Sequence, residues 1–537
     1  MRGAYKPAGK SGQTLETALR EISPEIYGTM NDPRSIEIAG LEYVLDRLPK
    51  GIEEATRIVL TAQEDLKDTA FEKIEPLKRR RISYRMSDQE ICFVITRGLS
   101  EVYDVITHLT FLNIEARKIH AQMRDSSGDI SSIWKELERN LENRDNLDVK
   151  QLDQAIWNLS ILLGRTYQET KHTFDSLEKS KTEKGTNNGL FHIIYQLGLQ
   201  VEEGIKSKDR ELLIYYTPSF RDMIAHQKVS RDWARTVKNR LQELGLLERP
   251  LHVISANMHS VKNLLYAYAA LDKNKEGKKK PDIFEFIKEH RTDDKKLNAY
   301  AAKHGMTEYT DNSGANINFQ IFNTEKLKNV SLHPALKIDK KMIASDKPVI
   351  LVMDYAFGTQ AFEVMDELLA PIEPEMTRPV KNILSISIMG KAGILPGQKG
   401  DIMLATAHVM EGSSHNYLVN NDVSKADFDD SIDVYEGPIV TVLGTSLQNR
   451  DVLEKFQQTS WKAIGLEMEG GHYHRAISAA IIKGHINRKT KTRYAYYASD
   501  NPLKSGQTLA SGGMGDEGIR PTYMIAKVFV EKILGGE

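Results

Sequence analysis

The segment "IGLEMEGGHYHRA", residues 464–476, reads as a short strand that turns directly into a helix. Glu467 and Glu469 flank Met468 at the junction between the two. A junction that served packing alone would favour apolar residues at these positions. In α/β sheets, ligands bind outside the carboxyl ends of the strands. The segment therefore predicts both an α/β sheet and a ligand site at its edge.

The same strand-then-helix pattern recurs through the second half of the chain. From residue 249 on, a β-branched run, a polar turn and an amphipathic helix follow one another. Similar stretches lie at 347–369, 380–393, 437–456 and 492–506. Strands that alternate with helices indicate a central, mainly parallel mixed sheet covered on both faces. We predict an α/β domain over residues 247–537, with a helical insertion at about 272–312.

The first half has a different character. Residues 14–246 contain long charged and apolar stretches with helical periodicity, such as "ICFVITRGLSEVYDVITHLTFL" at 91–112, and few prolines. A polar break at 179–189 is typical of a loop within a domain. The pattern predicts an all-α N-terminal domain over residues 1–246, to which the sequence assigns no role.

Length and composition restrict the kind of protein. A chain of 537 residues is too long for one core, so two domains are expected. Its 73 basic and 74 acidic residues give a net charge of −1, which favours neither nucleic acid nor a membrane surface as partner. The single cysteine, Cys92, lies in an apolar run and is expected to be a buried hydrophobe. Without a signal-like N-terminus or a long apolar run, a cytoplasmic protein is expected.

Two lysine- and arginine-rich stretches have an open interpretation. "KRRR" at 78–81 and the lysine run near 272–280 are either solvated surface or contacts for phosphate, and the first is favoured. His472 and His474 are two positions apart on an expected helix and point in different directions, so a shared metal ion is not expected. No cofactor is predicted.

A second strand-like run, later in the sequence, also ends in polar residues. Ser499 and Asp500 come directly after the strand-like run "YAYYA". A carboxylate at such a position is either a turn former or an acid placed for chemistry. Taken alone, Asp500 leaves both interpretations open. Together with Glu467 and Glu469, it favours a site.

The motifs around these residues resemble a known superfamily. "SWKAIGLEMEG" (460–470), followed by "YYASDNPLKSG" (496–506), resembles the nucleoside phosphorylases and nucleosidases. "IMGKAGILPGQKGDIMLATAHV" (388–409) resembles the glycine turn and strand of that superfamily. "GTSLQNRDVL" (444–453) is most similar to AMP nucleosidase. The resemblance covers roughly residues 250–537 and implies a phosphorylase-like α/β fold that cleaves N-glycosidic bonds.

The resemblance also implies roles at the base and the sugar. Cleavage of a purine ribosyl bond passes through an oxocarbenium-like sugar while negative charge moves onto the base. Asp500 would protonate or hydrogen-bond N7 of the purine, with Ser499 orienting it. Glu469 would accept the ribose hydroxyls and Met468 would lie against the ribose ring. Glu467 is either a second acid or a backbone anchor.

Further substrate contacts are expected from loops. Backbone groups near Ser446 and Leu447 would read the adenine, and Arg450, beside Asn449, would hold a 5′-phosphate. His415 is either a loop histidine or a neighbour of the sugar. The remaining candidates lie at strand ends or at a helix N-terminus, where backbone or cationic groups meet anions: Gly390, Lys391, Gly393, Gly358, Thr359 and His259.

The loop after the first strand bears on the choice of the attacking nucleophile. Phosphorylases of the superfamily usually hold phosphate with a Gly-Asp-Pro-x-Arg loop after the first strand, whereas this chain has "ISANMHSVKN" at 254–263. Water is therefore favoured, but the glutamate with which small nucleosidases activate water is also missing from this loop. His259 or Asp354 is a possible replacement.

The sequence thus predicts hydrolysis of a purine nucleotide, AMP by preference, to adenine and ribose 5-phosphate. A purine nucleoside phosphorylase or another nucleosidase is the first alternative. A nucleotide-sensing or scaffold protein that only binds its ligand is the second. The resemblance implies a homo-oligomer, and the expected partner is a small-molecule purine nucleotide or nucleoside.

Overall fold

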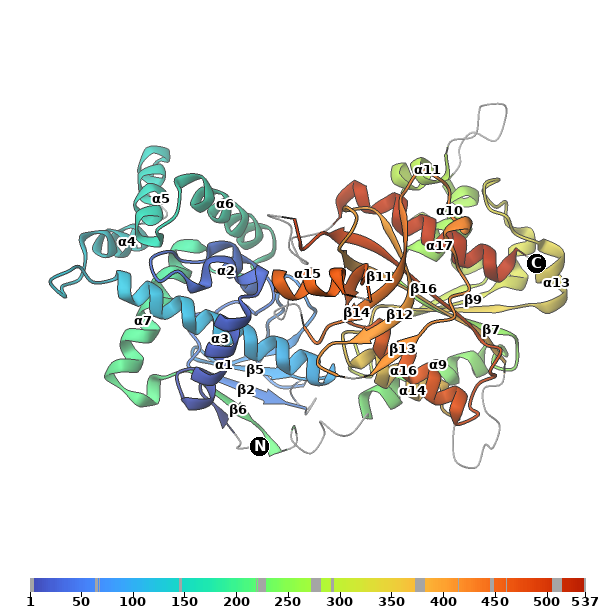
Figure 1. The fold of residues 1–537 in the computed structure, drawn as a ribbon, viewed down its shortest axis with the longest axis horizontal. Helices are drawn as coiled ribbons and strands as arrows, with labels where there is room; N and C mark the ends of the chain where they lie inside the picture. Colours follow the sequence, from blue (N-terminus) through green and yellow to red (C-terminus); the bar gives the residue numbers. More distant parts are fainter. Residues whose placement is uncertain are drawn as a thin grey trace. The chain divides into compact units, whose positions relative to one another are not determined.

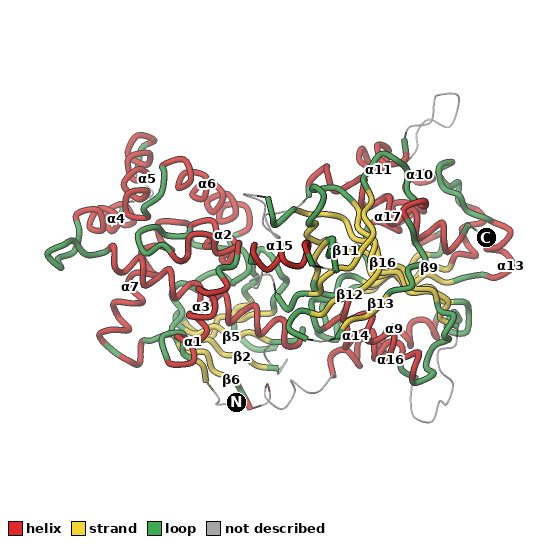
Figure 2. The backbone as a smooth tube through the Cα atoms, viewed as in Figure 1, coloured by secondary structure: helices red, strands yellow, loops and turns green. Residues whose placement is uncertain are grey.

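The structure is a computed structural model of the chain. It describes residues 4–62, 66, 68–143, 147–218, 220, 228–271, 282–290, 294–371, 382–413, 415–444, 449–459, 461–504 and 514–535. By its internal contacts the chain forms two compact units. The first comprises Met1–His226 and Gly444–Arg450, and the second comprises Gln227–Leu443 and Asp451–Glu537. Figure 1 and Figure 2 show the helices and strands of each.

The first unit contains a mixed six-stranded sheet in addition to helices. Its strand order is β1-β6-β2-β5-β4-β3, in which β6, β2 and β5 are parallel. The strands are β1 (Ala4–Tyr5), β2 (Arg57–Thr61), β3 (Glu72–Lys73), β4 (Ile82–Ser87), β5 (Glu90–Val94) and β6 (Leu213–Tyr216). The helices are α1 (Lys10–Ile22), α2 (Ile38–Leu45), α3 (Gly98–Gln122), α4 (Ser132–Glu142), α5 (Val149–Leu163), α6 (Tyr167–Lys184) and α7 (Leu190–Lys206).

The all-α prediction for this half was therefore wrong. The run at 91–112, which we interpreted as one helix, is divided between β5 and α3. A continuous apolar run fits a buried strand as well as a buried helix, and here the break is Gly98, whose φ of 70° is typical of glycine. Cys92 lies in β5 and is buried, as predicted. Burial raises the pKa of its thiol to about 12, so it is an unreactive group.

The second unit has the predicted α/β class. Its strands are β7 (Leu251–Ser255), β8 (Met306–Tyr309), β9 (Phe319–Asn323), β10 (Val349–Met353), β11 (Ile383–Ile394), β12 (Ile402–Met410), β13 (Asn416–Leu418), β14 (Val434–Thr441), β15 (Gly465–Glu467) and β16 (Lys491–Asp500). The central strands β10, β7, β11 and β16 are mutually parallel. Strands β12, β14 and β15 are parallel to one another and run in the opposite direction.

Part of this sheet closes on itself. Strand β16 pairs with β11 on one side and with β12 on the other, while β12, β14, β15 and β11 follow one another by pairing. These five strands form a ring. Closure of this kind removes free strand edges and brings the ends of strands far apart in the sequence to one rim.

Helices cover both faces of the sheet (Figure 1). They are α9 (Lys228–Glu243), α10 (Ser260–Leu271), α11 (Ile283–His290), α12 (Asp294–Lys303), α13 (Lys340–Asp346), α14 (Gln360–Leu369), α15 (Arg450–Gln458), α16 (Gly470–Ile482) and α17 (Ile519–Leu534). Alternate residues of β16 enter different cores. Tyr494 and Tyr496 pack with α9, α14 and α16, whereas Ala495 and Tyr497 pack with α10, α11, α12 and α17. This is the period-2 alternation of a strand buried on both faces.

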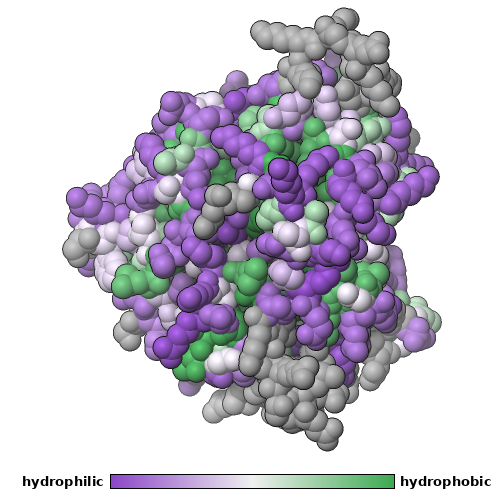
Figure 3. Space-filling view, turned by 90° about the vertical axis from the view of Figure 1, so that its right-hand side faces the viewer, coloured by the Kyte–Doolittle hydropathy of each residue, from purple (hydrophilic) through white to green (hydrophobic). Residues whose placement is uncertain are grey.

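The domain boundary differs from the expected residue 246. Helix α9 belongs to the second unit, where Trp233 is fully buried and donates from Nε1 to the carbonyl of Ile317 at 2.8 Å. In the expected insertion, the described residues form α11, α12 and the edge strand β8. The lysine run lies outside the described residues. None of the described helices is long and apolar enough to span a bilayer, and the face in Figure 3 is mainly hydrophilic.

Candidate active site

Glu467 ends β15 and anchors the start of α16. Its buried carboxylate accepts the backbone N–H groups of Glu469 and Gly470 and the hydroxyl of Thr441. The ring of His408 is also fully buried, and its Nδ1 lies 3.6 Å from Oε1 of Glu467. Burial alone would raise the pKa of Glu467, but His408 and these hydrogen bonds outweigh it and lower that pKa. Of the two roles left open for Glu467, the backbone anchor is the one with observed contacts.

The two glycines that begin α16 allow this close packing. A Cβ at Gly470 would lie 2.1 Å from the hydroxyl of Tyr496 and 2.4 Å from Cε1 of His408. A Cβ at Gly471 would lie 2.6 Å from Oγ1 of Thr441, which accepts the Gly471 N–H at 3.0 Å. Side chains at either position would push the helix away from the strand ends. The sequence "EMEGG" thus forms a closely packed junction between β15 and α16.

Glu469 connects this junction to the turn after β10. Its Oε1 accepts the N–H of Gly358 at 2.9 Å, in the turn between β10 and α14. Gly358 has a φ of 54°, and Thr359 is the N-cap residue of α14. The sequence had suggested that this helix N-terminus holds an anion of the substrate. In the structure the Gly358 amide bonds a carboxylate of the protein itself.

Met468 contributes the apolar surface of the site. It is 8% exposed and belongs to a small core cluster with Phe357, Leu395, Val440 and Leu466. A thioether in such a cluster offers a polarizable, adaptable face to a ring that packs on it. The carboxylates of Glu467 and Glu469, on either side of Met468, accept hydrogen bonds from backbone N–H groups.

Asp500 ends β16 beside a bulge. The pairing of β16 with β11 passes from Ala498 to Asp500 and leaves Ser499 without a register partner. Bulges of this kind redirect side chains and are common beside active sites. The Ser499 hydroxyl lies 3.2 Å from the carbonyl of Ala392 and also contacts Oδ1 of Asp500. Ser499 therefore holds one oxygen of this carboxyl in place.

The other oxygen of Asp500 has no hydrogen-bond partner among the described residues, although the side chain is only 2% exposed. Burial raises the pKa of Asp500 to about 6, against the opposing effects of Ser499, Lys391 and Lys399. A buried carboxyl with an unpartnered oxygen is costly unless it meets a partner that the apo protein lacks. With a pKa near neutrality it can donate or accept a proton.

The turn after Asp500 is tied to the end of β11. The Asn501 side-chain amide donates to the carbonyls of Leu395 and Gly397, at 3.0 and 2.9 Å. Its Oδ1 accepts the N–H of Leu503 at 2.9 Å. Asn501 is 1% exposed, so these three bonds are made inside the protein. They fix the backbone of the "SDNPL" turn that follows Asp500.

The strand register brings the two polar strand ends together. Asp500 pairs with Gly393 of β11, and Gly393 pairs with Leu466 of β15. Two strand spacings separate Asp500 from Leu466, which is about 10 Å. Met468 and Glu469 follow Leu466 by two and three residues. Asp500 thus ends one strand that flanks β11, and Met468 and Glu469 follow the end of the strand on the other side of β11, which runs in the opposite direction.

The remaining candidates have different surroundings. Lys391 is exposed on β11, and its charge lowers the pKa of Asp500. Gly390 has room for a side chain, because a Cβ would be 3.5 Å from the nearest atom, on Tyr496. Asp354 is buried, and its Oδ1 accepts the N–H of Tyr355 at 2.9 Å.

His259 lies in the loop after β7. Its side chain is exposed, and its Nδ1 is 2.8 Å from the hydroxyl of Tyr523. Asn263 donates to the same hydroxyl at 2.8 Å. His415 is exposed in the turn between β12 and β13, where the Ser413 hydroxyl accepts its N–H at 3.0 Å.

The residues expected to read the nucleotide fall in a segment that the structure describes only in part. Asn449 and Arg450 fall in the segment Gly444–Arg450, which clusters with the first unit, and the Asn449 amide donates to the carbonyl of Ile22. Arg450 is the first residue of α15. Ser446 and Leu447 lie outside the described residues. A phosphate contact by Arg450 stays a sequence prediction.

Sequence reasoning missed three residues around Glu467. His408, Thr441 and Tyr496 come from β12, β14 and β16, and each is buried against the start of α16. The only signal was a histidine at an inward position of the apolar strand "IMLATAHVM". His474, for which we expected no metal, lies 3.0 Å from the hydroxyl of Tyr494 through Nδ1.

Comparisons with known proteins define the family. A family model described as a family of unknown function, DUF6909, matches residues 13–294 and 283–535. The chain belongs to this family. The comparison with curated proteins gives no significant match.

Several solved structures resemble about half of the chain. One is the 5′-methylthioadenosine/S-adenosyl homocysteine nucleosidase of Campylobacter jejuni, with 11% identity over 53% of this chain and 98% of that one, at a TM-score of 0.31. A mutant futalosine hydrolase of Helicobacter pylori has 11% identity over 53% and 99%, at 0.30. Uridine phosphorylase of Schistosoma mansoni in complex with uracil has 11% identity over 55% and 88%, at 0.32. Identities this low say nothing about substrate or mechanism.

Proposed function

We propose that the second unit is an N-ribosyl hydrolase that cleaves a purine nucleotide, AMP by preference, to the free base and ribose 5-phosphate. The observation that carries the proposal is Asp500: a buried carboxyl with a pKa of about 6 and one oxygen that has no hydrogen-bond partner among the described residues. It ends β16, two strands away in the sheet from β15, which leads into Met468 and Glu469. The preference for AMP rests on the sequence resemblance alone.

Asp500 is proposed to act on the leaving base. As the glycosidic bond lengthens, electron density moves into the purine ring and N7 becomes basic. The unpartnered Oδ2 of Asp500 shares or transfers a proton to N7, while Ser499 keeps Oδ1 in place. A carboxyl with an ordinary pKa would be almost wholly ionised at pH 7 and a poor donor. The raised pKa of Asp500 supports this role.

Glu469 and Met468 are proposed to act on the sugar. The Glu469 carboxylate is fixed by the Gly358 N–H and accepts the ribose hydroxyls, placing negative charge close to the cationic sugar. Met468 packs against the ribose ring from its small core cluster. Glu467 does not touch substrate in this proposal, because its oxygens hold the backbone of Glu469 and Gly470.

Water is the proposed nucleophile, and His259 is the proposed group that receives its proton. His259 is exposed at the carboxyl end of β7, on the same rim as the β10–α14 turn, because β7 and β10 are parallel and in register there. Its Nδ1 is oriented by the Tyr523 hydroxyl. Asp354, the other candidate, is buried and bonds the N–H of Tyr355, which makes it the poorer base.

The test is a product assay with the full-length protein. AMP, GMP, adenosine and methylthioadenosine are incubated with and without inorganic phosphate, and the free base and the sugar product are quantified. Base release from AMP without phosphate supports the hydrolase, and an absolute requirement for phosphate identifies a phosphorylase instead. Binding of AMP without any base release refutes the enzyme and leaves a nucleotide-binding protein. Light scattering of the same sample tests the predicted homo-oligomer.

A further inference from the structure

Three side chains of the first unit form a compact group outside the proposed active site. Glu53 and Glu54 lie in the turn before β2, and His192 lies in the first turn of α7. One ligand atom of each lies within 4.8 Å of the others. We call these three the Glu53–Glu54–His192 group. Some 140 residues of chain separate the two glutamates from the histidine, so the fold itself brings them together.

The contacts within the group leave two carboxylates beside one imidazole. The His192 Nε2 is 2.5 Å from Oε1 of Glu54. Glu53 is 2% exposed, and its Oε1 accepts the side-chain amide of Asn188 at 2.7 Å. Removing a carboxylate from water beside a second one is unfavourable unless a positive charge compensates both.

A second histidine–glutamate pair in the same unit lacks this feature. His120 Nε2 is 2.7 Å from Glu202, and the same carboxylate also pairs with Arg124 at 2.9 Å and Lys206 at 3.2 Å. That carboxylate forms ion pairs with two further cations. The charges of Arg85 and Lys50 also act on Glu54, but the His192–Glu54 pair has a second carboxylate, Glu53, within ligand distance. The difference is one of ligand chemistry: two oxygen donors and one nitrogen donor converge at the Glu53–Glu54–His192 group.

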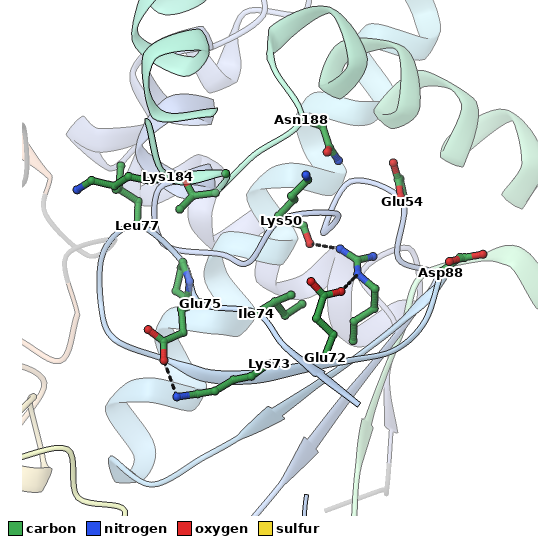
Figure 4. Close-up of a pocket in the computed structure, with 14 residues that line it drawn as sticks. Lys50, Glu54, Glu72, Lys73, Ile74, Glu75, Leu77, Asp88, Lys184 and Asn188 are labelled. Carbon is green, nitrogen blue, oxygen red and sulfur yellow. Dashed lines mark hydrogen bonds and ion pairs between the residues drawn. The ribbon is translucent and has the colours of Figure 1, made fainter. Parts of the chain in front are cut away.

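The group adjoins a cavity of about 860 Å³ (Figure 4). Glu54 and Asn188 line one end of it, and Lys184 lies at the other side. Lys50 lies between them. The guanidinium of Arg85, which also lines the cavity, donates to the Lys50 carbonyl at 2.7 Å. A volume of this size is within the range that holds small molecules. Glu54 is the member of the group that lines this cavity, so a ligand bound on that side is open to water or to a bound molecule.

We propose that the Glu53–Glu54–His192 group binds a divalent transition-metal ion, with its remaining coordination positions facing the cavity. Two carboxylates and one imidazole are a ligand set of Zn²⁺ and of Mn²⁺ or Fe²⁺, while Mg²⁺ prefers oxygen ligands alone. Three protein ligands with an open side are typical of sites that exchange their fourth ligand. The cavity wall holds Lys50, Lys73 and Lys184 but also Glu72, Glu75 and Asp88, so it does not select the charge of a fourth ligand. This site is independent of the function proposed for the second unit.

The experiment measures Zn²⁺ binding to the chelator-treated full-length protein. Isothermal titration is run on the wild type, His192→Gln, Glu54→Gln and the matched control His120→Gln. The expected result is one site per chain in the wild type and in the control, weakened at least tenfold in both other variants. Mg²⁺ is expected to bind at least tenfold more weakly than Zn²⁺.

Two results overturn the proposal: a wild type that binds no stoichiometric Zn²⁺, or a His192→Gln variant that binds it as the wild type does. Circular dichroism checks that each variant is folded. If a variant is not folded, Co²⁺ titration of the wild type shows whether the metal site exists. Visible d–d absorption that saturates at one ion per chain and is displaced by Zn²⁺ supports the site, and its absence overturns it.

Discussion

Replacing Asp500 by asparagine removes the proposed proton donor while keeping the shape of the side chain. With a pKa of about 6, about one Asp500 in eleven is protonated at pH 7, against about one in 1,600 for an aspartate with the ordinary value of 3.8. Burial thus increases the acid form more than 100-fold at pH 7. Since general acid catalysis contributes about 10²- to 10⁴-fold, Asp500→Asn should lower kcat/KM for AMP by a factor in that range.

The assay follows adenine release as a function of pH. In the wild type, kcat/KM should fall by about tenfold per pH unit above pH 6, because only protonated Asp500 donates. In Asp500→Asn this falling limb should disappear. Wild-type kcat/KM in the variant, or a falling limb that persists there, would refute the role of Asp500.

The same variant has a stability signature that shows whether it is folded. The folded pKa of Asp500 is raised, so the wild type has its full stability below pH 3.8 and loses some as the pH rises through about 6. A shift of about two units corresponds to about 3 kcal/mol for this buried group. Asp500→Asn should therefore be more stable than the wild type at pH 8, by up to about 3 kcal/mol, and equally stable near pH 3.5. Urea unfolding at both pH values measures this, and equal stability at pH 8 would contradict the raised pKa.

Three further variants test the rest of the site. Glu469→Gln should keep its fold but lose at least about 100-fold in kcat/KM, since the charge beside the sugar is gone; unchanged kinetics would exclude a sugar contact. Gly470→Ala should destabilise the protein by about 1–3 kcal/mol in urea, because its Cβ would meet Tyr496 and His408, and wild-type stability would contradict that packing. The pKa of Glu467 is lowered from 4.5, so its stabilising effect exists at neutral pH and is lost as the pH falls below 4.5. Glu467→Gln should accordingly cost about 1–3 kcal/mol at pH 7 and less at pH 3.5, and a cost that does not depend on pH would argue against a buried carboxylate there.

The two halves of the chain were predictable to different degrees. In the second unit, β7, β10 and β15 are each followed directly by a helix. Strand-like and helical patterns therefore alternate along much of the sequence, and these local patterns were enough to predict the α/β class. In the first unit, β2 and β5 are five-residue strands, and β5 is separated from α3 by only three residues. A strand this short gives no alternation that differs from a buried helix segment. The sheet there exists because strands distant in sequence pair, as β2 does with β6.

The sequence alone determined which residue types stand at the strand ends. Glu467, Met468, Glu469 and Asp500 were identified there because polar groups interrupt apolar periodicity, which is a local property of the chain. Only the tertiary structure decided which of these side chains are buried and which groups they bond. Glu469 accepts the N–H of Gly358, 111 residues away in the sequence. Asp500 is buried, and one of its oxygens has no partner among the described residues. Burial and electrostatics depend on which segments pack together, and no local spacing encodes that.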